Sequence, residues 1–103
     1  MKSVQTGDGL GNETLSTDVA FTMLSNGRRR QVLHYLKQRG ERVTVRELSR
    51  RVAAWENGVT VDELDYKQRK RVYTALHQTH LPKLAAAGVV DYDRDRGTVA
   101  LGR

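Results

Sequence analysis

The middle of the chain is divided by helix-start signals at short intervals. Between residues 44 and 68, Thr or Asp is followed three residues later by Glu or Gln in three places: Thr44–Glu47, Thr60–Glu63 and Asp65–Gln68. In such a capping box each residue accepts a hydrogen bond from the backbone N–H of the other, so each pair marks the beginning of a helix. The spacing therefore favours a fold of short helices with tight connections.

The N-terminal third carries two further helical patterns. Apolar residues recur at helical spacing in residues 17–24 and again in residues 28–38, and Ser25-Asn26-Gly27 between them predicts a break. Residues 1–15 contain three Gly and few large apolar side chains. Such a segment cannot bury enough surface to order itself, so we expect a flexible tail at residues 1–15 and one folded domain over residues 16–103.

The third helix begins at Thr44 and ends near Asn57. Its apolar residues fall on one face of a helix with 3.6 residues per turn: Val45, Leu48, Val52 and Trp55. We expect those four side chains in the core, and Ser49 and Ala53 turned toward solvent.

The fourth helix, from residue 66 to about residue 87, has two different faces. Val72, Leu76 and His80 lie on the packing side at 100° per residue. The opposite side is basic and polar. Pro82 is the position at which we expect a bend, because its ring removes one backbone donor and crowds the preceding turn.

The C-terminal end has the pattern of a β-hairpin. Val89–Tyr92 and Thr98–Leu101 flank a five-residue loop that contains Gly97, and Val43 adds a short strand before the third helix. Helix, short strand, helix, helix and terminal hairpin is the element order of a winged helix-turn-helix domain, in which the helix before the hairpin enters the major groove. We predict a mainly α fold with a small β-hairpin, of the winged helix-turn-helix class.

Charge is segregated along the chain and agrees with this prediction. The net charge is +6, and residues 28–51 contain nine basic and two acidic residues, whereas residues 66–83 contain five basic residues and no acidic one. Basic blocks of this kind suit a nucleic-acid surface. A chain of 103 residues forms only a small hydrophobic core, and an enclosed substrate pocket would take up most of it. We therefore predict no enzymatic activity, cofactor or small-molecule substrate.

The sequence also lacks membrane and secretion signals. Its longest stretch without a charged residue, Val72–Pro82, has 11 residues, whereas a bilayer-spanning helix needs about 20 apolar residues. The N-terminus has no apolar signal core, and there is no Cys for a disulfide framework. We expect a cytoplasmic protein without a membrane partner.

Four segments carry a resemblance to a known family: Leu24–Leu36, Glu47–Glu56, Tyr73–Leu84 and Gly88–Tyr92. The first is similar to the opening helix of ArsR-like winged-helix regulators. Together they resemble a winged-helix family abundant in haloarchaea and their mobile elements, over residues 16–101. The resemblance implies a DNA-binding transcription regulator that forms dimers.

Two departures qualify this resemblance. Metal-sensing ArsR-like proteins use cysteine thiolates, and this chain has no Cys, so their metal-release mechanism does not carry over. Proteins of extreme halophiles are usually acidic, whereas this chain has a pI near 10.1. A basic surface in such a host strengthens the prediction of nucleic-acid binding.

The candidate DNA-reading residues lie on the fourth helix and in the hairpin loop. Gln pairs with adenine, Arg with guanine, and Thr contacts the thymine methyl group, while Arg in a wing suits phosphates or a minor groove. The predicted set is Tyr66, Lys67, Gln68, Lys70, Arg71, Thr74, Gln78, Arg94 and Arg96. We predict a sequence-specific regulator that binds double-stranded DNA. The alternative is a winged-helix module whose basic face binds an acidic protein partner without contacting DNA.

Two further predictions concern assembly and metal. Val19, Phe21 and Met23 spread apolar surface around the first helix, so we predict that this helix forms the interface of a homodimer. His77 and His80 have a spacing that can share a metal ion. We predict no metal site, because His80 lies on the packing side and a closed zinc site needs four ligands.

Overall fold

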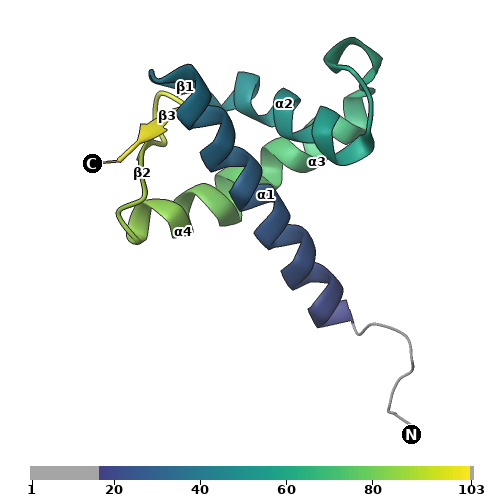
Figure 1. Cartoon of the computed structure of the whole chain (residues 1–103), viewed down its shortest axis with the longest axis horizontal. Helices are drawn as coiled ribbons and strands as arrows, with labels where there is room; N and C mark the ends of the chain where they lie inside the picture. The colour runs from purple at the N-terminus through teal and green to yellow at the C-terminus, as the bar shows by residue number, and fades with distance from the viewer. Residues whose placement is uncertain (1–16, 103) are drawn as a thin grey trace, which may run out of the picture.

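The computed structural model describes the backbone of residues 17–102 and the side chains of residues 25–102 (Figure 1). The predicted flexible tail, residues 1–15, lies outside this part of the chain. The elements follow in the order α1 (Thr17–Arg39), β1 (Val43–Thr44), α2 (Val45–Asn57), η1 (Val61–Glu63), α3 (Tyr66–Ala75), η2 (Leu76–His80), α4 (Leu81–Ala86), β2 (Val90–Asp93) and β3 (Thr98–Leu101). The described part is mainly helical with a small antiparallel sheet, which confirms that part of the predicted fold class.

The three strands form one antiparallel sheet in the order β1-β3-β2. β2 and β3 form the predicted hairpin, with Tyr92 opposite Val99. The predicted short strand at Val43 is β1, which pairs with the other side of β3. The N–H of Val45 donates to the carbonyl of Gly97 at 2.8 Å, so the hairpin loop is held beside the start of α2.

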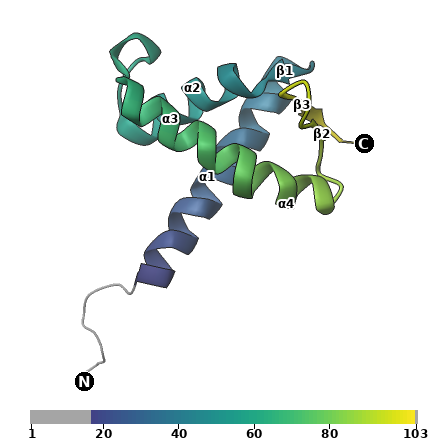
Figure 2. The same cartoon turned by 180° about the vertical axis from the view of Figure 1, so that it is seen from behind.

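The helices enclose one core. Figures 1 and 2 show α1 on one face of the molecule and α3 with α4 on the other, while the sheet lies at the end that carries the C-terminus. Every helix and strand contributes buried apolar residues except the short η1 turn. The apolar side chains with an exposed fraction of 1% or less are Val32, Leu36, Val45, Leu48, Val52, Ala53, Val72, Leu76, Leu81 and Val99. Burial of each large side chain contributes about 1.5–3 kcal/mol.

α1 is one continuous helix, so the predicted break at Ser25-Asn26-Gly27 is wrong. Glycine inside a helix costs only about 1 kcal/mol relative to alanine, which tertiary contacts can offset. The Trp55 ring of α2 packs over Gly27, where an added Cβ would lie 3.4 Å from the ring. Arg28 forms a two-pronged ion pair with Glu56 of α2, at 2.9 Å (Nε to Oε1) and 2.8 Å (Nη2 to Oε2). Packing against α2 therefore holds α1 together where local sequence rules would end it.

α2 is buried over a wider arc than its apolar stripe predicts. Three of the four stripe residues are in the core as expected: Val45, Leu48 and Val52. Trp55 is 50% exposed, whereas Ser49 and Ala53, expected toward solvent, are buried. At Ser49 and Ala53 the prediction is wrong because α2 contacts both α1 and α3, which cover more than one side of the helix. At Trp55 it is wrong because the ring packs over Gly27 of α1 and leaves half of its surface exposed.

Residues 66–86 follow one helical path, but not as a single α-helix. α3 and α4 are joined by η2, a π-helical turn in which the N–H of Leu81 donates to the carbonyl of Leu76, five residues earlier. Pro82 follows in the first turn of α4. Because Pro82 has no N–H, the regular hydrogen-bond ladder is interrupted here, and a π turn is one way in which helices accommodate such an interruption.

Candidate nucleic-acid interface

α3 is fixed at its start by the predicted capping box. Asp65 Oδ1 accepts the N–H of Gln68 at 2.7 Å, and Gln68 Oε1 accepts the N–H of Asp65 at 3.0 Å. The other end of the Gln68 amide, Nε2, donates to Asn57 Oδ1 at the end of α2, at 3.2 Å. Both ends of the Gln68 amide are therefore engaged within the protein.

The solvent-facing side of α3 and η2 carries the other helical members of the predicted DNA-reading set. Val72 and Leu76 on the opposite side are buried in the core. Tyr66 is 63% exposed at the start of the helix. The six predicted residues that share the outer face, of which only Thr74 is partly covered, are Tyr66, Lys67, Lys70, Arg71, Thr74 and Gln78.

A groove between α2 and α3 adjoins this face. It has a volume of about 530 Å³ and is lined by eight residues, which we call the basic groove: Arg46, Ser49, Arg50, Tyr66, Arg69, Lys70, Tyr73 and Thr74. Four of the eight are Arg or Lys, and none is Asp or Glu. A cleft lined by one sign of charge focuses its electric field, so the basic groove attracts anions.

Sequence reasoning missed one wall of the groove. Arg46 and Arg50 are four residues apart on α2 and therefore lie on the same side of that helix. The spacing of the two arginines is visible in the sequence. That this face of α2 lines a groove with α3 depends on how the two helices pack. Tyr73, which is 40% exposed, also lines the groove and was not in the predicted set.

Aromatic rings lie among these cations. Lys70 Nζ is 5.7 Å from the centroid of the Tyr66 ring, which is the distance of a cation–π contact. Tyr73 adds a second partly exposed ring to the same groove. A tyrosine offers an apolar ring face and a hydroxyl that hydrogen-bonds to phosphate oxygens, so both residues can contact a nucleic acid.

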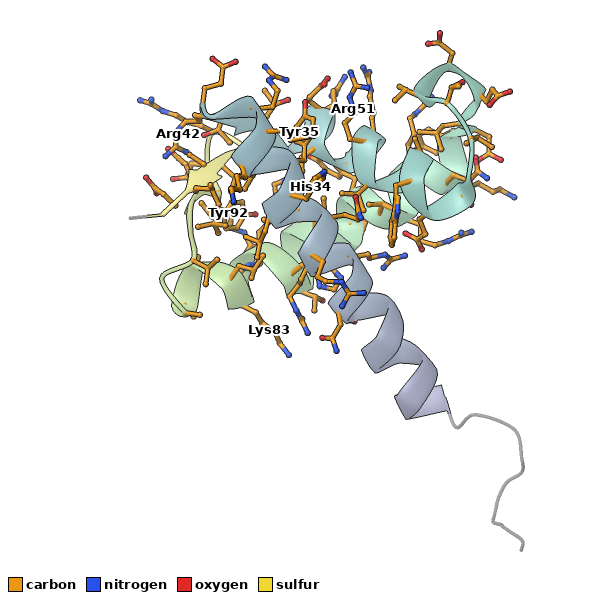
Figure 3. The ribbon with its side chains drawn as sticks, in the orientation of Figure 1. His34, Tyr35, Arg42, Arg51, Lys83 and Tyr92 are labelled. Atoms are coloured by element: carbon orange, nitrogen blue, oxygen red, sulfur yellow. The ribbon has the colours of Figure 1, made fainter. Side chains whose placement is uncertain are left out.

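The ion pairs among the described side chains involve other surfaces. Tyr35 and Arg51 lie on the α1 side of the molecule (Figure 3), and both bind Glu47 Oε2, at 2.9 Å from the tyrosine hydroxyl and 3.2 Å from Arg51 Nε. The hydrogen bond from Tyr35, with the contribution of Arg51, lowers the pKa of Glu47. Arg42, labelled near the sheet, pairs with Asp91 at 2.6 Å. No ion pair between described residues includes a cation of the basic groove, so these charges are not neutralised by the described carboxylates.

The hairpin loop presents the two predicted wing residues, Arg94 and Arg96, and both are exposed. Asp93 Oδ1 accepts the N–H of Arg96 at 3.1 Å, and Asp93 Oδ2 lies 3.8 Å from Arg96 Nε. Arg94 has no ion pair within the described part of the chain. Burial, and then the charge of Arg94, lower the pKa of His77.

His77 and His80, which we predicted not to form a metal site, have different surroundings. His77 Nδ1 is hydrogen-bonded to the Tyr92 hydroxyl, while His80 is buried between the helices. The residues described by the structure contain no cluster of three or more His, Cys, Asp or Glu arranged to hold a metal ion.

Two other predictions concern the dimer interface on α1 and the absence of a membrane-spanning helix. The backbone of Val19, Phe21 and Met23 belongs to α1, but their side chains are outside the described part. Among residues 17–102, no helix combines the length and the apolar character needed to cross a bilayer.

Comparison with known proteins finds one family. A family model described as "Domain of unknown function (DUF7344)" matches residues 21–100. The chain belongs to the DUF7344 family. No curated protein and no solved structure matches the chain. The DUF7344 domain extends from α1 into β3, so the basic groove and the hairpin both lie within the part shared with the family.

Proposed function

We propose that this DUF7344 protein is a sequence-specific transcriptional regulator that binds double-stranded DNA through a winged helix-turn-helix domain of ArsR-like type. The observation that carries the proposal is the basic groove, in which four cations and two tyrosines meet without a carboxylate beside the exposed face of α3. Duplex DNA carries one negative charge per ~1.7 Å of its axis, and a protein gains affinity by releasing the counterions of these phosphates.

The element order supports the same function. α2 and α3 precede a hairpin whose loop lies beside the start of α2, so α3 and the loop can face one ligand. A major groove about 12 Å wide admits an α-helix. In this arrangement Arg71 and Gln78 read base edges, and Arg94 contacts the backbone or the minor groove. Arg46 and Arg50 add phosphate contacts from α2.

We also propose that the regulator is a homodimer formed through α1. Figure 1 shows the N-terminal half of α1 extending away from the other helices and the sheet. Two linked DNA-binding domains raise the effective concentration at the second half-site, which favours dimers among small DNA-binding domains. Light scattering of the full chain against a chain that begins at Ser25 tests this assembly. A monomeric full chain, or a shortened chain that stays dimeric, contradicts it.

The DNA-binding proposal is tested by selection from a randomised duplex pool. The wild-type protein is expected to enrich a short motif, and Lys70→Ala/Arg71→Ala is expected to lose that enrichment. Lys37→Ala/Lys83→Ala is the matched control, because it removes two exposed charges outside the basic groove. Equal loss in the control would show a general charge effect and would refute the assigned interface. If the wild-type protein enriches no motif, the alternative of an acidic protein partner is favoured.

A further inference from the structure

Three aromatic rings connect α3 and η2 to the hairpin. His77 Nδ1 in η2 is hydrogen-bonded to the hydroxyl of Tyr92 in β2. The Tyr73 ring of α3 packs edge-on against the His77 ring, with centroids 4.6 Å apart, and the His77 and Tyr92 ring centroids are 5.7 Å apart. Residues from α3, η2 and β2 therefore meet beside the basic groove, of which Tyr73 is a member.

The π turn determines where His77 lies. In η2 the hydrogen bond spans five residues instead of four, so the residues of this turn depart from the regular α-helical spacing of α3. Leu76 and His80, at the two ends of the turn, are buried in the core, whereas His77 is only partly buried and faces Tyr92. π turns of this kind occur often at functional sites.

Arg94 follows Tyr92 closely along the chain. Tyr92 and Arg94 are two residues apart around the end of β2, and the charge of Arg94 acts on both rings. Burial and then Arg94 lower the pKa of His77, whereas for Tyr92 burial raises the pKa and Arg94 opposes the rise. The lowered pKa favours the neutral form of the His77 ring, which keeps one nitrogen able to accept a hydrogen bond.

We propose that His77 and Tyr92 form a latch that fixes the hairpin against α3, so that Arg94 contacts the same duplex as the cations of the basic groove. The latch deepens the proposed function and rests on it. His77 is thus a positioning residue: it does not contact DNA, but it sets the place of a cation that does. Opening the latch leaves the charge of the interface unchanged and removes the contact between β2 and η2, while the pairing of β3 with β1 and the Val45–Gly97 hydrogen bond remain.

A double-mutant cycle tests the coupling. Duplex affinity is measured by fluorescence anisotropy, on the motif selected by the wild-type protein, for Arg94→Ala in the wild-type and Tyr92→Phe backgrounds. Tyr92→Phe removes one oxygen and keeps the ring. Arg94→Ala is expected to weaken binding several-fold in the wild-type background and hardly at all in Tyr92→Phe. An equal loss in both backgrounds overturns the latch, because a general loss of stability would leave the two effects additive.

The role of His77 in the hydrogen bond is tested by substitutions that keep or remove a polar atom at the position of Nδ1. The amide of His77→Asn places a polar atom one bond from Cγ, as Nδ1 is in histidine, whereas His77→Leu places only carbon there. His77→Asn is expected to retain the cost of Arg94→Ala, and His77→Leu to lose it. The same result for both variants overturns the role of the hydrogen bond.

Amide hydrogen exchange in the free protein separates the latch from the proposed function. Residues 90–101 are expected to exchange faster in Tyr92→Phe and His77→Leu than in the wild-type protein and His77→Asn, while exchange in α1 stays the same. Unchanged exchange in the hairpin overturns the latch. If the wild-type protein binds no duplex, the role of Arg94 falls with the proposed function, and the exchange result still decides whether the latch holds the hairpin.

Discussion

Replacing His80 by Leu is predicted to remove much of the protein's sensitivity to mild acid. The His80 side chain is 1% exposed, and no hydrogen-bond partner meets its Nδ1. Burial lowers its pKa from 6.5 to about 4, with smaller contributions from the nearby charges of Arg28, Arg29 and Lys83, which Glu56 opposes. The folded protein therefore keeps this ring neutral at a pH where the unfolded chain protonates it.

The size of the effect follows from these two pKa values. Above pH 6.5 neither state is protonated at His80, and stability has its full value. As the pH falls below 6.5, only the unfolded chain takes up the proton, so the free energy of unfolding decreases until the pH reaches the folded pKa of about 4. Each pKa unit corresponds to 1.36 kcal/mol, so the loss amounts to about 2 kcal/mol at pH 5 and about 3 kcal/mol below pH 4.

Urea unfolding followed by circular dichroism measures this loss at pH 7.5, 6.0 and 5.0. His80→Leu is expected to match or exceed wild-type stability at pH 7.5, because it replaces an unpartnered buried nitrogen by an apolar group, and to lose about 2 kcal/mol less than the wild-type protein by pH 5. His34→Gln, at an exposed position of α1, is the control and should retain the wild-type pH dependence. Parallel pH profiles for the wild-type protein and His80→Leu would show that His80 is not the source of the acid sensitivity.

Three further predictions concern α1 and the interface. Gly27→Ala should raise the free energy of unfolding by about 0.5–1 kcal/mol in urea denaturation, because alanine favours helix and its Cβ would make ordinary contact with the neighbouring indole; destabilisation would contradict a continuous α1. Arg71→Ala should weaken specific binding by about 1–3 kcal/mol and relax one operator position, whereas Lys67→Ala should weaken all duplexes alike in anisotropy titrations; uniform losses in both would make Arg71 a phosphate contact. Replacing Arg94 and Arg96 together by Ala should reduce the slope of log K against log salt by about 1–2, and an unchanged slope would show that the hairpin stays off the DNA.

The sequence predicted those features that depend on neighbouring residues. The capping box at Asp65 forms as expected and begins α3. At Thr44 only half of the predicted box forms: the Thr44 side chain accepts the N–H of Glu47 at the start of α2, whereas the Glu47 carboxylate accepts from Tyr35 and Arg51. The hairpin pairs in antiparallel register, and Gly88 after α4 adopts the left-handed conformation that suits a glycine at the end of a helix. The basic outer face of α3 also follows from local spacing, because Val72 fixes which side of that helix is buried.

The remaining features depend on contacts between segments distant in sequence. The break predicted near Gly27 is absent because Trp55 and the Arg28–Glu56 pair hold α1 to α2. Gln68 has the right residue type and exposure pattern for reading DNA, yet its amide joins α3 to α2. The second wall of the basic groove and the latch likewise form only when helices pack against each other. The spacing of residues within one segment does not predict such packing.

Genome-wide sequencing of the DNA that co-purifies with the tagged, cross-linked protein from its host is the decisive test of sequence-specific DNA binding. We expect discrete sites that share a motif, and loss of these sites in Lys70→Ala/Arg71→Ala but not in Lys37→Ala/Lys83→Ala. Diffuse coverage of the genome would contradict sequence-specific reading by α3. No enrichment over an untagged control would contradict DNA binding itself.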